Sequence, residues 1–276
     1  MYKVKENKLK GNSKVSEEHL DYLESHGTMK RAISLSRIII LISIFALWEV
    51  AAHLQWIDPF IMSQPTRIFK TIVNLSKDGS LFLHTGVTLY ETIVGFLAGT
   101  ILGTIIAIIL WWSDFLAKVL DPYLVVLNAL PKTALGPVIL VWIGGTTKSI
   151  IVMALLVSII VTIINVYSSF KSCDEEKIKL LKTFGAKKWQ ILKLVVLPSN
   201  IPAIIAALKI NVGLSLVGVI VGEFLVSRAG LGFLIIYGGQ VFKMDLVMTS
   251  VLILATAAAV LYLAVLWIEK KVSQMM

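Results

Sequence analysis

Two stretches of this chain contain no charged residue over a length sufficient to cross a membrane. Residues 149–170 are uncharged across 22 positions and residues 246–268 across 23 positions. A helix needs about 20 apolar residues to cross the hydrocarbon core of a bilayer. Only 16% of the 276 residues are charged, whereas a typical soluble domain has about 25%. The chain is therefore predicted to be an all-α protein that crosses the membrane several times.

The hydropathy pattern predicts six transmembrane helices. They cover residues 33–54, 87–112, 117–143, 149–170, 201–224 and 246–268. The third span is the least regular, because Pro122, Pro131 and Pro137 interrupt it. Prolines at membrane depth are tolerated where neighbouring protein satisfies the freed backbone groups. We therefore expect the third span to lie inside the helix bundle.

The distribution of basic residues predicts the orientation of the chain. Six spans put both termini on one side, and a cytoplasmic N-terminus gives 18 Lys and Arg inside against 7 outside. Cytoplasmic loops concentrate these residues. The predicted organisation is a polar cytoplasmic tail over residues 1–32 and a transmembrane domain over residues 33–272. A cytoplasmic loop over residues 171–198 belongs to that domain.

Composition excludes several classes of function. The single cysteine, Cys173, allows no disulfide or Cys-based metal site within one chain, and the four histidines are widely separated. The net charge of +9 is concentrated beside apolar segments, which is typical of membrane topology rather than nucleic-acid binding. The sequence has no glycine-rich phosphate loop. We therefore expect no enzymatic activity, no metal or cofactor on this chain, and no nucleic-acid partner.

Two spans carry glycines at four-residue spacing. They are Gly95, Gly99 and Gly103 in the second span, and Gly218 and Gly222 in the fifth. Small residues along one stripe let helix backbones approach closely within a membrane. The pattern favours helix packing, with glycine-mediated movement as the alternative.

The 171–198 loop has the pattern of two short helices. Apolar residues follow helical spacing up to Phe184, Gly185 then breaks the helix, and a second segment over residues 188–197 ends at Pro198. A helix pair of this kind, lying along the membrane surface, offers a shaped contact for a soluble partner. The alternative is an ordinary basic loop that only sets topology.

The same loop resembles the EAA loop of permease subunits of binding-protein-dependent ABC importers. In that loop a glycine is followed ten residues later by an aliphatic residue and then by Leu-Pro. The matching residues are Gly185, Val195, Leu197 and Pro198. Two further blocks also match: Leu130-Pro131 through Trp142-Ile143-Gly144, and Glu223 followed by Gly230-Leu231-Gly232-Phe233. Together, over residues 35–272, they are similar to the nitrate/sulfonate/taurine branch of these permeases.

Three positions depart from the family pattern. Lys179 stands where the loop usually has an acid, Leu181 where it has alanine, and Glu91 where relatives often carry a basic residue. Asp174, Glu175 and Glu176, about one turn earlier, are candidate replacements for the missing acid.

The resemblance implies a type I ABC importer permease-like bundle in a bacterial plasma membrane. Two copies would enclose a pathway, each docking one ABC ATPase subunit, and ATP and Mg would reside on that ATPase. The docking residues implied on this chain are Glu175, Leu181, Gly185, Ala186, Val195, Leu197 and Pro198. An extracytoplasmic solute-binding protein would deliver a sulfonate, taurine, nitrate or related compound, with a thiamine-precursor-like vitamin as the alternative substrate.

Polar and glycine residues near the fifth span are candidates for the pathway or its gate. They are Lys209, Asn211, Ser215, Glu223, Gly230 and Gly232. A charge at membrane depth is costly and usually faces a cavity or a partner. Lys209 lies about 21 Å from Glu223 along the helix, too far for a direct pair. The alternative is that Glu223 stabilises the external helix turn and that Lys209 reaches the cytoplasmic face.

A self-sufficient secondary transporter or channel is the alternative function. Such transporters usually contain repeated halves with a binding site between them. The proline-broken third span has no counterpart after the fifth span, which favours the importer permease.

Overall fold

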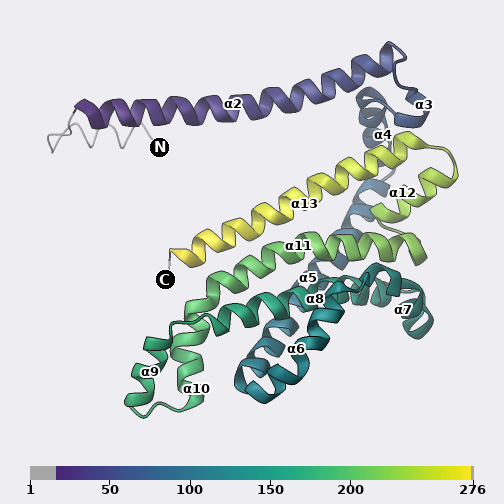
Figure 1. Ribbon diagram of the computed structural model, residues 1–276. Helices are drawn as coiled ribbons and strands as arrows, with labels where there is room; N and C mark the ends of the chain where they lie inside the picture. The colour runs from purple at the N-terminus through teal and green to yellow at the C-terminus, as the bar shows by residue number, and fades with distance from the viewer. Residues whose placement is uncertain (1–16, 275–276) are drawn as a thin grey trace. The chain divides into compact units, whose positions relative to one another are not determined.

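A computed structural model gives the fold of residues 17–274 (Figure 1). The described residues are helices and connecting turns, without a β-strand. They form two compact units, one ending at Thr66 and the other beginning at Arg67. Residues 1–16 of the predicted tail lie outside the described part.

The first unit contains a single long helix and a short one. Helix α2 (Glu17–His53) continues without a break through the predicted boundary between residues 32 and 33, and α3 (Pro59–Met62) follows it. The Glu49 carboxylate accepts hydrogen bonds from the Thr66 backbone N–H, at 2.9 Å, and from the Thr66 hydroxyl. A carboxylate at this position satisfies a free N–H at the start of the next helix, α4 (Pro65–Lys77).

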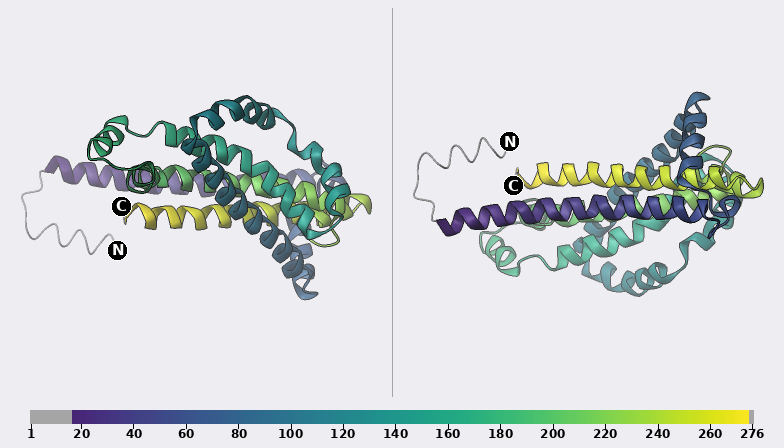
Figure 2. Two further views of the ribbon diagram at one scale, coloured as in Figure 1. Left: turned by 90° about the horizontal axis from the view of Figure 1, so that it is seen from below. Right: turned by 90° about the horizontal axis from the view of Figure 1, so that it is seen from above.

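The second unit holds the remaining helices. In chain order they are α5 (Ser80–Trp112), α6 (Asp114–Ala129), η1 (Lys132–Leu135), α7 (Gly136–Ile143), α8 (Thr147–Lys171), α9 (Glu175–Thr183), α10 (Lys188–Ile191), η2 (Leu192–Val196), α11 (Leu197–Val226), α12 (Leu231–Gln240) and α13 (Met244–Ser273). Helix α8 packs against both α5 and α11, which also contact one another, and α13 packs against α11 and α12. Figure 2 shows α11 and α13 running alongside one another.

Glycines allow the close approach of these helices. A Cβ at Gly95 would lie 2.5 Å from the Ala154 Cβ, and a Cβ at Gly103 would lie 2.6 Å from the Thr162 Cβ. On α11, a Cβ at Gly218 would lie 2.6 Å from the Ala154 Cα. The packing interpretation of the glycine stripes is confirmed, since any side chain at these positions would push α5 or α11 away from α8.

The third predicted span is a bent pair of helices. Five helices are long and apolar enough to cross a membrane, and the pair α6 with η1–α7 makes six if it is counted as one span bent by 87°. Leu130 is extended (ψ 137°) because the following Pro131 disfavours a helical residue before it. The bend therefore lies at the predicted proline break.

The bent pair is not enclosed by the other helices of its unit, so the expectation of a span inside the bundle is wrong for the single chain. Val141 and Trp142 are exposed, the latter at 79%. Local contacts satisfy the backbone instead, such as the Ala134 N–H bonded to the Pro131 carbonyl at 2.9 Å. The bent pair still contacts the bundle on one side, since η1 and α7 pack against α8 and α7 also packs against α11, with Gly136 and Ile139 buried.

Candidate functional site

The 171–198 loop folds as the predicted pair of helices separated by a glycine. Helix α9 ends at Thr183, Gly185 has a φ of +75°, and α10 begins at Lys188. The Gly185 N–H bonds to the Lys182 carbonyl at 2.9 Å, and the Ala186 N–H bonds to the Leu181 carbonyl at 3.0 Å. Glycine adopts a positive φ at little cost, and this pair of bonds satisfies the last carbonyls of the helix.

One face of the loop packs into the helix bundle. Ile191, Leu192 and Val196 are buried in a cluster with residues of α5, α8 and α11, and five further loop residues pack partly against it. Those five are Ile178, Leu181, Ala186, Val195 and Leu197. Four residues of the predicted docking set (Leu181, Ala186, Val195 and Leu197) therefore hold the loop on the bundle.

Other apolar side chains of the loop are exposed. Phe184 is 78% exposed, and Leu180 and Trp189 are also exposed. Gly185 and Pro198 are exposed as well. Exposed apolar side chains that lie together on a surface mark a binding region more often than a merely solvated loop.

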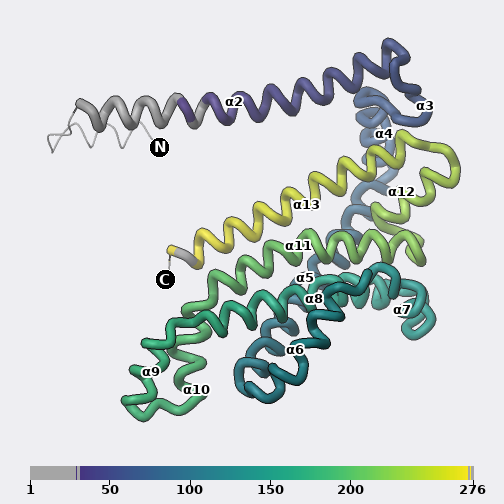
Figure 3. Tube along the Cα trace, in the orientation of Figure 1, coloured from purple at the N-terminus to yellow at the C-terminus, as the bar shows by residue number. Residues whose placement is uncertain are grey.

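The segment after α10 differs from the prediction, because Pro198 does not end the helix. A π-helical turn, η2, joins α10 directly to α11, and the Leu197 N–H bonds to the Leu192 carbonyl five residues earlier. Proline in a helix removes one N–H and crowds the carbonyl four residues before it. The wider π turn accommodates both effects and lets the helix continue, with a change of direction visible in Figure 3.

Polar contacts fix the loop to its neighbours. The Lys188 ammonium donates to the Trp112 carbonyl at 2.7 Å, at the end of α5, and lies over the Trp111 and Trp112 rings. The Ser169 hydroxyl of α8 donates to the Asn200 side chain of α11 at 2.5 Å. The base of the loop is therefore held by two neighbouring helices.

Charged residues of α9 interact only with their near neighbours in sequence. The Asp174 carboxylate accepts the Glu176 N–H at 2.9 Å, and this hydrogen bond lowers the pKa of Asp174 below its usual value. Glu175 forms an exposed ion pair with Lys179 at 3.1 Å. One of the three candidate acids, Glu175, thus contacts the lysine that stands in place of the usual acid, in a pair too exposed to stabilise the helix much.

A second polar site lies where α11 ends and α12 begins. The Thr88 hydroxyl of α5 donates to Glu223 Oε1 at 2.6 Å, and the Gly232 N–H donates to Glu223 Oε2 at 2.5 Å. The Leu231 N–H donates to the Thr88 hydroxyl oxygen at 2.8 Å. Glu223 is 1% exposed, so its carboxyl group joins three helices in the interior. We call Glu91, Glu223, Thr88 and the Leu231–Gly232 backbone the acid cluster.

The Glu223 carboxyl group leaves no room for a side chain at either glycine of this turn. A Cβ at Gly230, where φ is +122°, would overlap the Glu223 carboxyl group. At Gly232, a Cβ would lie 2.8 Å from Glu223 Oε2. The Gly230 N–H donates to His84 Nδ1 at 2.9 Å. The turn therefore closes tightly around Glu223.

Glu91 is the second carboxyl group of the acid cluster. It is 0% exposed, and neither of its oxygens has a hydrogen-bond partner among the described residues. The Glu223 carboxyl group and the Thr147 side chain are the polar groups that interact with it. The two carboxyl groups thus interact with each other, and both are almost completely buried.

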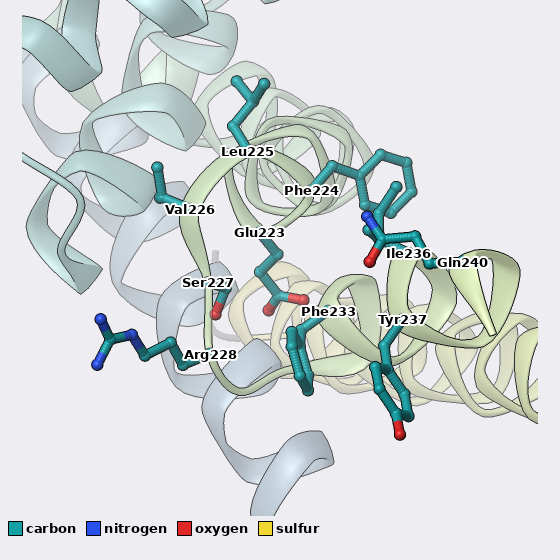
Figure 4. A pocket seen from close by; sticks show the side chains of 10 residues that line it. All are labelled: Glu223, Phe224, Leu225, Val226, Ser227, Arg228, Phe233, Ile236, Tyr237 and Gln240. Atoms are coloured by element: carbon teal, nitrogen blue, oxygen red, sulfur yellow. The ribbon is translucent and has the colours of Figure 1, made fainter.

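A cavity of about 330 Å³ lies beside this turn. Its lining comes from the end of α11, the turn and α12: Glu223, Phe224, Leu225, Val226, Ser227, Arg228, Phe233, Ile236, Tyr237 and Gln240. Figure 4 shows Arg228 directed away from the Glu223 carboxyl group. The Phe233 ring stacks between His84 and Tyr237, with centroid distances of 5.8 and 5.9 Å.

The other pathway candidates on α11 lie in the helix interface or in an ion pair. Asn211 Nδ2 donates to the Thr100 hydroxyl at 2.7 Å and to the Thr162 hydroxyl at 2.6 Å, and its Oδ1 has no partner in the described part. Ser215 is fully buried there too. Lys209 forms a half-buried ion pair with Glu269 of α13 at 2.7 Å.

The structure thus separates the six pathway candidates into three groups. Glu223, Gly230 and Gly232 lie together at the turn, and Asn211 and Ser215 lie between α5, α8 and α11. Lys209 lies near the middle of α11, on the side that faces α13, where it pairs with Glu269. Within residues 17–274, no three His, Cys, Asp or Glu side chains gather as a metal site would require.

Sequence reasoning missed the contribution of α5 to the acid cluster. His84, Thr88 and Glu91 are spaced four and three residues apart, so they share one face of the helix. The same face continues into Gly95, Gly99 and Gly103. A stripe of polar residues that continues into the glycine stripe on the same helix face is the sequence feature that could have pointed to a buried polar contact here.

Comparison with known proteins identifies the family. Residues 99–276 match the family described as "Binding-protein-dependent transport system inner membrane component". A "Probable ABC transporter permease protein" of Haemophilus influenzae is 31% identical over 80% of this chain and 90% of its own length.

Two further relatives carry more specific names. The "Formylaminopyrimidine transport permease protein ThiX" of Halalkalibacterium halodurans is 27% identical, over 74% of this chain and 82% of its own. The "Putative aliphatic sulfonates transport permease protein SsuC" of Bacillus subtilis is 27% identical, over 83% of each chain. The predicted resemblance to the sulfonate and taurine branch is confirmed.

A solved structure has the same fold. A chain of the MetNI methionine ABC transporter, in an inward-facing conformation, superposes with a TM-score of 0.61 over 68% of this chain and 94% of that one, at 18% identity. The predicted type I importer bundle is therefore confirmed as a fold. This chain belongs to the family of inner-membrane permease components of binding-protein-dependent ABC importers.

Proposed function

We propose that two copies of this chain form the membrane pathway of an ATP-driven importer, and that the 171–198 loop of each copy docks one ATPase subunit. The observation that carries the proposal is the two-faced loop. Its inner face is buried against α5, α8 and α11, while Leu180, Phe184 and Trp189 remain exposed. A rigidly held apolar surface fits a role in receiving a partner and passing its movement to the bundle.

The chain's own residues supply the mechanical part of the cycle. ATP and Mg would be held by the ATPase, whose closure draws the two docked loops together. Closure favours one arrangement of the permease helices over the other, and hydrolysis restores the first. Coupling of this kind requires that the ATPase bind the two states of the loop with different affinity.

The proposed orientation has the loop on the cytoplasmic side, where the ATPase would dock. With both termini in the cytoplasm, 18 basic residues lie inside against 7 outside, which agrees with the positive-inside rule. The turn that carries Gly230 then faces the extracytoplasmic solute-binding protein. The host membrane is the bacterial plasma membrane.

The exposed bent pair supports the second copy. Val141 and Trp142 of α7 are exposed apolar residues that no helix of the same unit covers. A membrane protein can leave such residues to lipid, but a bent, proline-containing segment needs protein around its irregular backbone. A second copy of the chain would supply it.

The docking proposal is tested with a matched pair of variants. Phe184→Glu is expected to abolish co-purification of the ATPase in mild detergent and to reduce uptake at least tenfold. Phe115→Glu is the control, because Phe115 is 79% exposed at the start of α6, outside the loop. Retained ATPase binding in the Phe184 variant, or equal loss in both variants, contradicts docking through this surface.

The proposed substrate is a small sulfonate, taurine, nitrate or related compound. The name of the Bacillus subtilis relative supports sulfonates, whereas that of the Halalkalibacterium halodurans relative supports a thiamine-precursor-like pyrimidine as the second candidate. Lys209 gives no support to an anion, because Glu269 balances its charge. Calorimetric titration of the co-purified binding protein with taurine, an alkanesulfonate, nitrate and an aminopyrimidine distinguishes the candidates.

A self-sufficient secondary transporter or channel is the alternative, and reconstitution separates the two. The importer must show solute flux in liposomes only when ATPase, binding protein and ATP are all present. Flux through the purified chain alone, without ATP, contradicts the proposal.

A further inference from the structure

We infer that Glu91 and Glu223 form a single-proton site among the transmembrane helices, in which Glu91 holds the proton beside an ionised Glu223. The ligand of this site is a proton bound by the resting protein. The inference does not rest on the identity of the solute or on docking of an ATPase.

The burial of both carboxyl groups limits their total charge. Glu91 is 0% exposed and Glu223 is 1% exposed, and neither forms an ion pair in the described part of the chain. Two adjacent carboxylates in a water-excluded region repel each other, and each also loses its hydration. The pair therefore carries one negative charge rather than two.

The hydrogen bonds identify Glu223 as the charged member. The Thr88 hydroxyl oxygen already accepts the Leu231 N–H, so the hydroxyl proton points to Glu223 Oε1. The Gly232 N–H points to Glu223 Oε2. Both donors favour an ionised acceptor, and the positive end of α12 adds to this preference.

Glu91 lacks any such support for a charge. Neither oxygen has a hydrogen-bond partner among the described residues, and an ionised Glu91 would be a buried charge without a donor, at a large cost in free energy. A carboxylate only accepts hydrogen bonds, whereas a protonated carboxyl group also donates. With a proton, Glu91 has an acceptor nearby in the Glu223 carboxyl group.

The other titratable groups nearby do not replace the proton. His84 accepts the Gly230 N–H through Nδ1, so that nitrogen carries no proton and the imidazole is neutral. Lys148 on α8, Arg228 in the turn and Lys243 before α13 are exposed, and Asp245 on α13 has its own interaction. Figure 4 shows Arg228 directed away from Glu223.

Infrared spectroscopy of the purified full chain tests the site directly. A protonated carboxyl group gives a carbonyl band separate from that of a carboxylate, and we expect this band at neutral pH in the wild type. Glu91→Gln should remove it, because the proton is lost with Glu91. Glu223→Gln should retain it, because Glu91 stays buried and neutral. Glu269→Gln is the control, since that carboxylate is paired with Lys209 and contributes no such band.

Three results would overturn the inference. One is the absence of the band in the wild type at neutral pH. Another is loss of the band in Glu223→Gln with retention in Glu91→Gln, which would put the proton on the other carboxyl group. The third is disappearance of the band when sodium chloride replaces choline chloride, since a metal cation would then compete for the site.

The pH dependence of stability provides a second test if a variant folds poorly. In the unfolded chain Glu91 is ionised at neutral pH, so unfolding releases the proton and a higher pH favours the unfolded state. The wild-type melting temperature in detergent should therefore fall as the pH rises between about 5 and 8. Glu91→Gln should show a smaller decline. A wild-type profile that rises throughout this range contradicts a bound proton.

Discussion

The acid cluster and the 171–198 loop lie at opposite ends of α11, and they use polar residues in opposite ways. The acid cluster joins residues far apart in sequence, such as Thr88 and Glu223, and excludes water from all of them. The charged residues of α9 pair with neighbours three or four positions away and remain exposed.

The difference indicates that the helices must stay in contact at the acid cluster, whereas the surface of the 171–198 loop must remain accessible to a partner. A hydrogen bond between buried groups on two helices is lost only if the helices separate. An exposed pair such as Glu175 with Lys179 exchanges freely with water or with a partner. The first arrangement fixes helix positions, and the second leaves a surface whose contacts can change.

Removal of the Glu223 carboxyl group should have the largest effect. Glu223→Ala leaves the Gly232 N–H and the Thr88 hydroxyl without their acceptor in the interior. We expect a loss of about 3 kcal/mol in the free energy of unfolding, measured by denaturant titration in detergent micelles. Phe184→Ala, in the exposed part of the 171–198 loop, should leave the free energy of unfolding nearly unchanged. An equal loss in both variants would contradict the difference between the buried acid cluster and the exposed loop.

A pair of glycines on α11 tests the tight packing between the two ends. Gly218→Ala should destabilise by about 2 kcal/mol, because the added methyl group meets the backbone of α8. Gly213 has nothing within 4 Å of an added Cβ, so Gly213→Ala should be neutral or stabilise the helix by up to about 1 kcal/mol. Thermal melts of the two variants decide this, and the same sign for both would contradict the packing account.

Gly185 should give a smaller and more local effect. Its φ of +75° is unfavourable for alanine, and Gly185→Ala should cost about 1 kcal/mol, although nothing lies within 4 Å of an added Cβ. Hydrogen exchange should accelerate in the last turn of α9 and remain unchanged in α8. Gly185→Asn is the control, because asparagine tolerates this conformation better. Faster exchange throughout the bundle would mean that the loop is not independent of it.

The smallest expected effect concerns the start of α9. Since the pKa of Asp174 is lowered in the folded loop, the helix start gains stability above the ordinary Asp pKa and loses it as the pH falls through the folded value. Amide exchange of α9 should therefore quicken at acidic pH. Asp174→Asn keeps a capping side chain but should abolish this pH dependence. An unchanged profile in that variant would exclude Asp174 as its source.

The sequence was sufficient to predict elements that depend on local pattern. The uncharged runs located the spans, Gly185 located the break in the loop, and Pro131 located the bend between α6 and α7. Each of these depends on the residues within one or two helical turns, so no knowledge of the remote chain was required.

The features that depend on remote contacts were not predictable in the same way. Pro198 was expected to end a helix, but a π turn before it lets the backbone continue. In the sequence, Glu91 stands out only as a departure from the family pattern, because its relation to Glu223 arises from the packing of α5 against α11. The sequence pattern does not connect Lys209 with Glu269, because the two residues are 60 positions apart and meet only through the packing of α11 against α13.

The π turn at η2 joins α10 and α11 into one helix that changes direction. The two helices are therefore not separated by a flexible loop. Residues Lys188–Val226 form one continuous helical segment. No flexible residue therefore lies between α10 and α11 that could absorb a displacement of α10. Glu223 lies roughly 40 Å along α11 from Leu197. A movement of the loop must either change the helical winding of η2 or move α11 and the turn around Glu223. The stiffness of five residues, Leu192–Val196, therefore sets how much of the movement reaches the far end.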